Sequence, residues 1–559
     1  MTPYSERADR IRFAANSFQN HVVDEFRAGR LDRRQFLRAA TVVGFSAGAA
    51  GLLAACGGES GGSATTTPSA SGMTGVAGGT ILAGALAPGA DLDPTTMSAA
   101  GGVCLFTQTG EYLSLSNGQP ELTPMLATGW QPNDDASIWT FSIRDGVTFN
   151  DGTPLTARDV AATFNRISDP DLGATAYNSI GGMFLPGAVE ATDDLTVVFE
   201  LEAPTGSFSW LVSSDLFGGV ILPENYDGGF ESTFIGTGPW LLEEYVRDER
   251  ASFVRNEDYW GELALPDRVE FTLFADDTAM LLALQSKSIE VVNSLTYARG
   301  RAVIDDTANF TTQKLQSSAH RFWTMRTDVA PLDDARVRQA IALSVDREAI
   351  VGSLVNGLAD IGNDSPLAPV FGTTDTAAPQ RTRDLDQAKA LLAEAGYDGT
   401  PLGLVVSDSH EIAELGQVLQ SQLAEAGIVV ELQVLDFATF SGDGRDASPA
   451  WDADMAIDSW GSRGVPNTFL ASQLKSDGSS NRSRYANAEL DTLIADFAAA
   501  VDLSTQREIS GRMQQLLLEE TPAVYGYFVN WLSASVTSLT GYEFTAMGSL
   551  RLSQAVHEQ

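Results

Sequence analysis

Histidine and cysteine, the side chains that most often bind transition metals or act as nucleophiles and bases, are scarce in this chain of 559 residues. The four histidines are His21, His320, His410 and His557, and none has a second histidine or cysteine at the spacing of a metal site. No HExxH or GxxxxGK(S/T) motif occurs. We therefore expect no metal site, no cofactor and no catalytic residues.

Adjacent acidic residues occur at several places where a turn or the start of a helix is expected. These pairs are Asp134-Asp135, Asp193-Asp194, Asp276-Asp277 and Asp333-Asp334. Neighbours in sequence seldom converge on one substrate atom, whereas a carboxylate at a helix start caps exposed amide groups. We interpret these pairs as structural rather than as the acid and base of an enzyme.

The charge balance argues against nucleic acid as a partner. Asp and Glu number 73 against 35 Lys and Arg, which gives a formal net charge of −38. A surface this acidic repels phosphate backbones and anionic lipid headgroups. With 43% apolar residues, the composition is that of a globular protein, and the length predicts two or three packed units.

Strand and helix patterns alternate in the first half of the folded body. A glycine-led apolar run at 78–86 and alternating apolar residues at 139–149 and 195–201 predict strands. Between them, residues 155–167 have apolar positions at helical spacing and a capping residue, Thr156. The interleaving predicts an α/β fold.

The second half contains longer helical patterns. Segments 333–355 and 384–397 predict helices. A strand at 401–408, a helix at 411–427 and a strand at 428–436 form a βαβ unit, whose two strands run parallel. We therefore expect this half to contain a mostly parallel sheet and the whole body to have two unequal lobes.

The N-terminal segment has the composition of a targeting sequence rather than of a folded domain. Arg33 and Arg34, followed by Gln-Phe-Leu, precede a weakly hydrophobic run at 39–55 that is rich in Gly and Ala. This pattern resembles a twin-arginine export signal, and the Leu-Ala-Ala-Cys sequence that ends at Cys56 resembles a bacterial lipobox. An alternative is an N-terminal membrane helix with a cysteine there by chance.

These resemblances imply a signal peptide at 1–55, acylation of Cys56 and a flexible Gly/Ser/Thr tether at 56–78. We expect an extracytoplasmic protein held at the membrane only through its lipid anchor. Cys104 would then be the one free thiol, so no internal disulfide is available, and its apolar neighbours predict a core position.

From Gly79 onward the chain resembles the extracellular solute-binding family that serves peptide, nickel and some oligosaccharide or opine ABC importers. The motifs that carry this resemblance are, in chain order, GGTILAGALAPGADLDP, LTPMLATGWQPNDDASIWTFSIRDGVTFNDGTPLTARDV, IGTGPW, VRNEDYWG, PLDDARVRQAIALSVDREAIV and AKALLAEAGY. The resemblance implies a two-lobed periplasmic-binding-protein fold of type II, in the large class with an extra inserted subdomain.

The family pattern also implies where the chain crosses between the lobes. Lobe I, with the inserted subdomain, is expected at 79–321, lobe II at 322–524, and the return to lobe I at 525–559. Two crossings, near 318–328 and 523–536, would form the hinge. Two crossings allow the lobes to close around a ligand that contacts both of them.

The function that the resemblance implies is capture of a small solute and its delivery to an ABC permease, without catalysis and as a monomer. We expect a short peptide or another peptide-like or carboxylate-bearing compound as the solute. One alternative is a receptor for an oligosaccharide or a metal chelate. The other is a sensor that works without an importer.

Two arginines occupy positions that suggest an anionic ligand. Peptide-binding members carry a segment resembling W-x-G-D-x-x-D-P, whose aspartate pairs with the peptide's amino group. Here Arg463 stands at or beside that aspartate and Val465 replaces the acid before proline, so this anchor is missing. Arg326 stands where asparagine is usual, and guanidinium groups suit a carboxylate or phosphate. The alternative is that these arginines pair with Asp458 and Asp328.

Four further residues complete the predicted site. Trp323 and Trp460 either stack on the ligand or pack in the core. Gly101 and Gly102 follow the first strand, where relatives bring backbone amides close to the ligand, or they only form a turn. Each of these roles depends on where the fold places the side chain or the backbone.

Overall fold

The computed structural model describes residues 75–97, 99–116, 122–442 and 447–558. Residues 74–559 form one compact unit, and the description below concerns that unit. The predicted export arginines Arg33 and Arg34 and the predicted lipidation site Cys56 lie outside the described residues. Within the described part of the chain, none of the helices is both long and apolar enough to cross a membrane.

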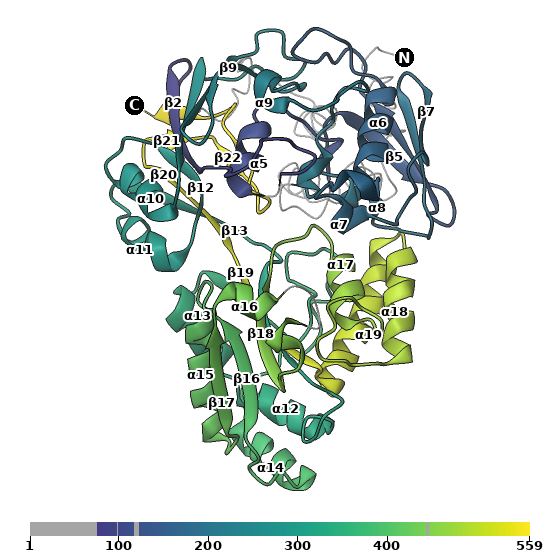
Figure 1. The fold of residues 1–559 in the computed structure, drawn as a ribbon, viewed down its shortest axis with the longest axis vertical. Coiled ribbons are helices and arrows are strands. Elements are labelled where there is room, and N and C mark those ends of the chain that lie inside the picture. The colour runs from purple at the N-terminus through teal and green to yellow at the C-terminus, as the bar shows by residue number, and fades with distance from the viewer. Residues whose placement is uncertain (1–74, 98, 117–121, 443–446, 559) are drawn as a thin grey trace, which may run out of the picture. The chain divides into compact units, whose positions relative to one another are not determined.

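A mixed seven-stranded sheet, in the order β13-β20-β12-β2-β11-β10-β9, is the centre of the part that we call lobe I (Figure 1). Its strands are β2 (Thr80–Leu86), β9 (Trp240–Val246), β10 (Arg250–Arg255), β11 (Arg268–Phe274), β12 (Val291–Leu295), β13 (Phe310–Leu315) and β20 (Trp531–Val536). Strand β2 runs parallel to β11 and β12, and the outer pairs are antiparallel. The predicted first strand is therefore confirmed at the middle of this sheet.

The inserted part of lobe I is an antiparallel four-stranded sheet covered by a helix. The strands, in spatial order, are β5 (Ala127–Pro132), β6 (Ile138–Ile143), β8 (Thr196–Glu200) and β7 (Val189–Asp193). Helix α6 (Ala157–Ile167) begins at Thr156, which forms a reciprocal capping box with Asp159, as the sequence predicts. Phe164 of this helix packs edge-on against Phe199 of β8, with ring centroids 5.1 Å apart.

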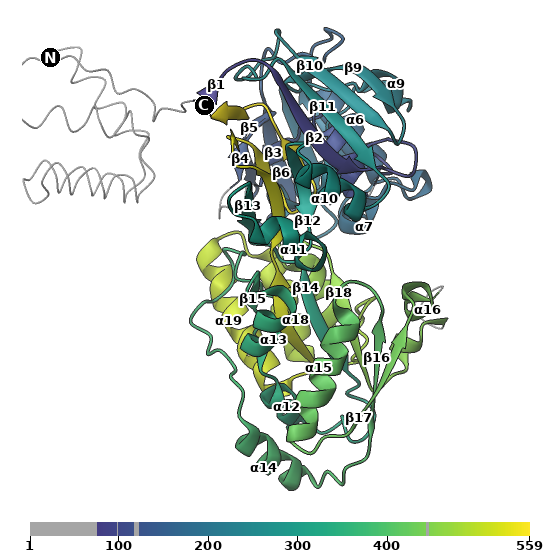
Figure 2. The ribbon, with the colours of Figure 1, turned by 90° about the vertical axis from the view of Figure 1, so that its left-hand side faces the viewer.

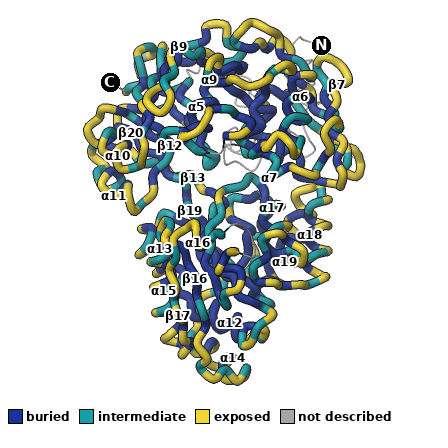
Figure 3. Tube along the Cα trace, viewed as in Figure 1, coloured by how far each residue is buried: buried dark blue, intermediate teal, exposed yellow. Residues whose placement is uncertain are grey.

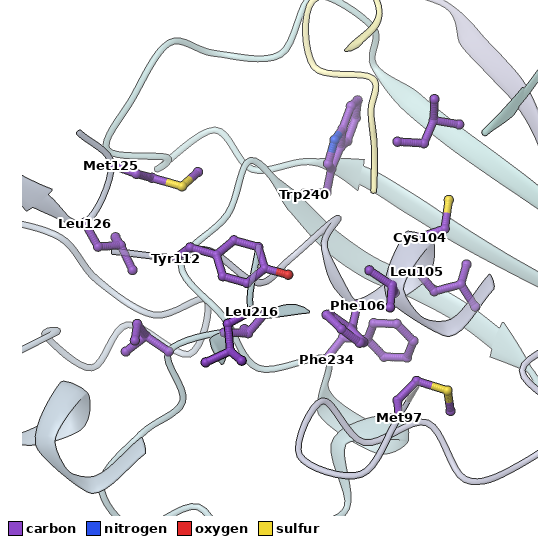
Figure 4. Close-up of a cluster of buried hydrophobic side chains, with 14 of the residues drawn as sticks. Met97, Cys104, Leu105, Phe106, Tyr112, Met125, Leu126, Leu216, Phe234 and Trp240 are labelled. Atoms are coloured by element: carbon purple, nitrogen blue, oxygen red, sulfur yellow. The ribbon is translucent and has the colours of Figure 1, made fainter. Parts of the chain in front are cut away.

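Short elements complete lobe I. The helices are α5 (Ala100–Phe106), α7 (Tyr177–Ile180), α8 (Phe208–Leu211), α9 (Phe230–Thr233), α10 (Asp277–Gln285) and α11 (Tyr297–Asp305), with 3-10 turns at Pro170–Leu172 and Phe217–Gly219. The small strands are β1 (Gly75–Val76), β3 (Ser114–Leu115), β4 (Thr123–Pro124), β21 (Leu539–Thr540), β22 (Glu543–Phe544), β23 (Leu550–Arg551) and β24 (Val556–Glu558). Figure 4 shows part of the apolar core beneath them, in which Cys104 is fully buried, as expected.

Lobe II is built on a six-stranded sheet in the order β15-β19-β14-β18-β16-β17. The strands are β14 (His320–Met325), β15 (Ala359–Ile361), β16 (Leu402–Ser407), β17 (Val430–Leu435), β18 (Met455–Trp460) and β19 (Ala523–Val529). The predicted βαβ unit is confirmed, because β16 and β17 are parallel (Figure 2). The expectation of a mostly parallel sheet is wrong, since β14 pairs antiparallel with β18 and β19, and β15 pairs antiparallel with β19.

The helices of lobe II are α12 (Ala335–Ser344), α13 (Arg347–Val355), α14 (Leu385–Ala395), α15 (Ile412–Glu425), α16 (Phe437–Ser441), α17 (Asn467–Phe469), α18 (Ala488–Ala499) and α19 (Leu503–Glu520), with a 3-10 turn at Pro449–Trp451 and a π-helical turn at Leu470–Leu474.

The segment 333–355, predicted to be helical, forms two helices, α12 and α13. Val345 has an extended backbone, and Asp346 caps the second helix by accepting from the Ala349 amide. Asp276 and Asp334 also cap helices, as the structural interpretation of the acid pairs predicts.

The chain passes between the two large sheets twice. It leaves lobe I at the end of β13 and enters β14 five residues later, and it returns from β19 to β20 through Asn530. Figure 3 shows the buried residues along the central strands, and every residue of β14 is buried. Each lobe has its own hydrophobic cluster, although the lobe I cluster also includes Val465 of lobe II, so both lobes can keep most of their packing if they move relative to each other.

Candidate functional site

A cavity of about 450 Å³ lies where the two lobes meet, a volume typical of small-molecule sites. We call it the interlobe cavity. Its lobe I wall consists of Ser116, Trp130, Pro132, Trp139, Gly206, Ser207, Ser209, Trp210 and Asp215. Its lobe II wall consists of Val370, Phe371, Gly372, Thr373, Ser462, Arg463, Gly464, Val465, Pro466, Val501, Leu503 and Gln506. Between the two walls the lining is completed by residues of the first crossing and of the C-terminal segment: Leu315, Gln316, Ser317, Thr545 and Ala546.

The lobe I wall is fixed by short-range hydrogen bonds around α8. The Trp139 indole Nε1 donates to the Thr205 carbonyl at 3.1 Å, which ties β6 to the chain that leads into α8. After the helix, the Ser213 hydroxyl donates to the Trp210 carbonyl at 2.7 Å and accepts from the Asp215 amide at 3.2 Å. These bonds set the turn that places Asp215 in the wall.

The lobe II wall is tied to the first crossing through a serine. The loop that carries Arg463 follows β18, and the Arg463 amide donates to the Ser318 hydroxyl at 2.7 Å. The same hydroxyl lies 2.7 Å from the Arg463 carbonyl and 3.2 Å from the Ser462 hydroxyl. A hinge movement at this crossing therefore acts directly on the backbone of Arg463.

Arg463 carries a positive charge without a carboxylate partner among the described residues. Its Nη1 donates to the Ser462 carbonyl at 2.8 Å, and its buried Nε has no hydrogen-bond partner. Burial lowers the pKa of the guanidinium from its ordinary value. The alternative of a pair with Asp458 is wrong, because Asp458 pairs with Arg482 instead.

Asp215 is the acidic counterpart on the opposite wall. Its Oδ2 is buried without a hydrogen-bond partner, and burial raises the pKa of the carboxyl to about 6, although a hydrogen bond with the Ser116 side chain acts in the opposite direction. No ion pair joins Asp215 to a cation within the described residues. The cavity thus contains an acid and a base that are not paired with each other.

Two glycines allow the lobes to approach beside this cavity. The Gly206 amide of lobe I donates to the Ala498 carbonyl of lobe II at 2.7 Å. A Cβ at Gly206 would lie 1.9 Å from the Ala500 carbonyl oxygen, and a Cβ at Gly464 would lie 1.8 Å from Asp215 Oδ2. At Gly206 the nearest atoms belong to the lobe II backbone, so any larger residue there would force the walls apart.

The other predicted site residues lie away from the interlobe cavity. Arg326 pairs with Asp328 at 2.6 and 3.0 Å, so the alternative of an internal ion pair is confirmed for this arginine. Trp323 is 1% exposed in the lobe II core, and Trp460 packs edge-on against Phe469, with ring centroids 5.9 Å apart. Both tryptophans are packing residues in this structure.

Gly101 and Gly102 are neither in a turn nor in a wall of the interlobe cavity. They lie buried in the first turn of α5. A Cβ at Gly101 would meet the Leu86 carbonyl oxygen at 1.8 Å, and one at Gly102 would meet Met97 Sδ at 2.5 Å. These glycines are needed for the close packing of α5 on the end of β2.

Sequence reasoning missed the lobe I wall. Asp215 is the single charged residue between Glu202 and Glu224, in a stretch of small and apolar residues. An isolated charge in such a stretch is costly to bury, which is a signal of function that could have been used. Trp210 and Phe371 carry no comparable signal, because aromatic residues are as common in cores as in binding sites.

A second cavity of about 300 Å³ lies within lobe I and shares Ser116, Leu315 and Thr545 with the first. Of its two acids, Glu111 and Glu543, Glu111 accepts from three donors: Tyr259 Oη at 2.6 Å, and Trp260 Nε1 and Thr237 Oγ1 at 2.8 Å each. A carboxylate with three internal donors has little capacity left for a ligand. No group of three His, Cys, Asp or Glu that could hold a metal ion occurs among the described residues.

Comparisons with known proteins agree with this architecture. The chain is 26% identical over 443 residues to the probable D,D-dipeptide-binding periplasmic protein of Escherichia coli (strain K12), covering 77% of this chain and 84% of that one. It is 26% identical over 472 residues to di/tripeptide-binding protein 2 of Pseudomonas aeruginosa (strain UCBPP-PA14), covering 77% and 86%.

Among solved structures, an ABC transporter substrate-binding protein of Listeria monocytogenes superposes with a TM-score of 0.75 at 23% identity, over 86% of this chain and all of that one. The two-lobed periplasmic-binding-protein fold is therefore confirmed. The model of the bacterial extracellular solute-binding proteins, family 5 (middle region), matches residues 121–481, about two thirds of the chain. The chain belongs to the family 5 bacterial extracellular solute-binding proteins.

Proposed function

We propose that this chain is the solute-binding lipoprotein of an ABC importer. It captures a short peptide, or another peptide-like or carboxylate-bearing compound, in the interlobe cavity and delivers it to the permease. The observation that carries the proposal is the convergence of unsatisfied polar atoms on this cavity. Its lining residues Ser207, Asp215, Thr373 and Arg463 each have a buried polar side-chain atom without a hydrogen-bond partner.

Unsatisfied buried polar atoms are unfavourable in a folded protein unless a ligand or water pairs with them. Here two of the four residues come from each lobe, so one small molecule in the cavity contacts both lobes. Such a ligand favours the arrangement in which the walls are close together. The permease then recognises the liganded arrangement. The two relatives described above, a probable D,D-dipeptide-binding protein and a di/tripeptide-binding protein, support a solute of this size.

The remaining parts of the proposal concern export and chain organisation. Residues 1–55 are a twin-arginine signal, residues 56–78 are a tether, and the mature protein is anchored outside the cytoplasm through acylated Cys56. Lobe I (79–321), lobe II (322–524) and the returning segment (525–559) form a monomeric receptor. The motifs around Arg33, Arg34 and Cys56 support this part.

The lipid anchor is tested by Cys56→Ala. We expect the variant to leave the membrane fraction and to appear in the extracytoplasmic soluble fraction, because the acyl chains attach to this sulfur. The Arg33→Lys, Arg34→Lys double variant should instead keep the precursor inside the cell. Membrane retention of Cys56→Ala would contradict the anchor.

The binding function is tested by a thermal-shift screen of the purified protein against short peptides, amino-acid conjugates, sugars and metal chelates. A ligand at a hundredfold excess over its dissociation constant adds about 2.7 kcal/mol of stability. We expect a clear shift with peptides or carboxylate-bearing compounds. A shift with sugars or chelates alone would replace the proposed solute class, and turnover of any of these compounds would contradict a binding protein.

A further inference from the structure

We infer that Asn530, the residue between β19 and β20, biases the protein without solute away from the arrangement of the lobes seen here. In this arrangement, which we call the contacted arrangement, the Gly206 amide of lobe I donates to the Ala498 carbonyl of lobe II at 2.7 Å. The bias comes from a buried side-chain amide that has no partner while the lobes touch. It goes beyond the proposed function, because it exists whatever the solute is; only its effect on affinity rests on that function.

Asn530 is the single residue that separates a strand of one lobe from a strand of the other. Strand β19 of lobe II ends at Val529, and strand β20 of lobe I begins at Trp531. The two flanking residues are held in different sheets, because β19 pairs with β14 and β15, whereas β20 pairs with β12 and β13. A rotation of the lobes therefore changes the backbone and the surroundings of Asn530.

The side chain of Asn530 is buried and unpaired. It is 4% exposed, and neither its Nδ2 donor nor its Oδ1 acceptor has a hydrogen-bond partner among the described residues. The equally buried Asn481 of lobe II is different, since its Nδ2 donates to the carbonyls of Lys475 and Tyr485 at 3.1 and 2.8 Å. Its Oδ1 accepts from the Ser483 hydroxyl at 2.8 Å. A buried donor and acceptor without partners destabilise the arrangement in which they occur.

The polar groups beside Asn530 are paired, so the unpaired amide is not a general property of the crossings. The Ser317 hydroxyl donates to the Val529 carbonyl at 2.6 Å, and the Val529 amide donates to the Ala319 carbonyl at 2.6 Å. The backbone amide of Asn530 reaches the Leu358 carbonyl only at 3.4 Å. The two crossings are thus tied firmly to each other, and the unfavourable group lies at the point where the second one changes lobe.

A solute in the interlobe cavity does not relieve this cost. Asn530 is not among the residues that line either of the two cavities, unlike Asp215 and Arg463, whose unpaired atoms belong to the lining of the interlobe cavity. The cost at Asn530 therefore remains when the solute binds, and it is removed only by a change in the arrangement of the lobes. Because the side chain makes no hydrogen bond in the contacted arrangement, any arrangement that brings it to water or to a polar neighbour is favoured over this one.

This bias lowers the affinity for a solute that needs both walls. The apparent dissociation constant is the intrinsic one divided by the fraction of protein in the competent arrangement. One buried polar group without a partner shifts such an equilibrium by roughly 10- to 100-fold. Asn530 thus keeps the lobes apart without solute, which lets the solute enter and leave.

Asn530→Leu tests the inference, because leucine has nearly the shape of asparagine and no polar atom, and the backbone at this position has no positive φ. Hydrogen–deuterium exchange of the full chain without solute follows the Gly206 amide. Its contact with Ala498 joins the chain before α8 to α18, on the other side of the interlobe region from the crossing strands β13 and β19 (Figure 1). Local repacking at Asn530 does not reach this contact. Calorimetry with trialanine measures affinity in parallel.

We expect the Gly206 amide to exchange roughly 10- to 100-fold more slowly in Asn530→Leu than in the wild type, and trialanine to bind more tightly by a similar factor. Asn481→Leu is the matched control: it removes paired hydrogen bonds within lobe II, so it should lower the urea midpoint and leave exchange at Gly206 unchanged. Asn530→Ala, which removes the same polar atoms without a larger side chain, replaces Asn530→Leu if circular dichroism shows that the leucine variant is not folded.

The outcomes separate this inference from the proposed function. Unchanged or faster exchange at Gly206 in the Asn530 variant would overturn the inference, even if trialanine binds and the receptor function stands. Slower exchange in a protein that binds no solute of any class would support the bias and contradict the receptor. Slower exchange with unchanged trialanine affinity would show that the bias does not control binding.

Discussion

Asp215 should destabilise the protein without added solute at neutral pH, and its replacement by asparagine should reverse this. Burial raises the pKa of the carboxyl from its ordinary 3.8 to about 6, so the folded protein holds a proton that the unfolded chain has released. Folded stability therefore falls as the pH rises from about 4 to 6, and it stays low above this range. Asparagine has nearly the shape of the protonated acid and carries no charge at any pH.

The size of the effect follows from the two pKa values. A difference of about two units corresponds to a gain of about 3 kcal/mol for Asp215→Asn at pH 7.5, as an upper limit. At pH 4.5 most of the folded carboxyl is already protonated, and the gain falls to about 1 kcal/mol. The groups that face the carboxyl do not titrate in this range: Ser116 is a hydroxyl, and burial and the nearby acid raise the pKa of the Tyr112 phenol further above its usual value.

The assay is urea unfolding of wild type and Asp215→Asn at both pH values, without added solute, and with Asp277→Asn as control. We expect a higher unfolding midpoint for Asp215→Asn at pH 7.5 and a smaller gain at pH 4.5. A loss of stability at pH 7.5 would show that the carboxylate is stabilised in the fold. A gain that does not change with pH would show that its ionisation is not the cause.

Further predictions concern the contact between the lobes and the core of lobe II. Gly206→Ala adds a Cβ 1.9 Å from a lobe II carbonyl oxygen and should weaken solute binding at least tenfold in calorimetry with little change in melting temperature; Gly352→Ala, whose Cβ meets no atom within 4 Å, should leave binding unchanged. Asp364→Ala removes the carboxylate that lies 2.6 Å from Arg347 and 3.2 Å from Arg381. Two buried guanidinium groups then lack a carboxylate partner, and urea unfolding should show a loss of roughly 3–5 kcal/mol; an unchanged midpoint would mean that water replaces the acid.

The fold was largely predictable because its signals are local. The capping box at Thr156 and the βαβ unit at 401–436 depend on residues that are close in sequence, and the structure shows both. The helix break at Val345 and the antiparallel partners of β14 were not predicted. Strand pairing depends on contacts between residues more than a hundred positions apart, which periodicity does not report.

The candidate site was predictable only in part. The loop around Arg463 stands out in the sequence, and the structure places this residue in the interlobe cavity. Arg326 looks the same in sequence but has Asp328 two residues away, and local pairing is favoured where a partner is that close. Asp215 was not predicted, because the family pattern places the acid of the site in lobe II, whereas this cavity takes its acid from lobe I.

The central claim is that one solute binds both lobes at the interlobe cavity. Hydrogen–deuterium exchange of the full chain, with and without the solute that gives the largest thermal shift, tests it most directly. We predict slower exchange of backbone amides in 206–216 of lobe I and, in the same experiment, in 461–465 of lobe II. Protection confined to one lobe, or to the second cavity around 107–112, would contradict the account.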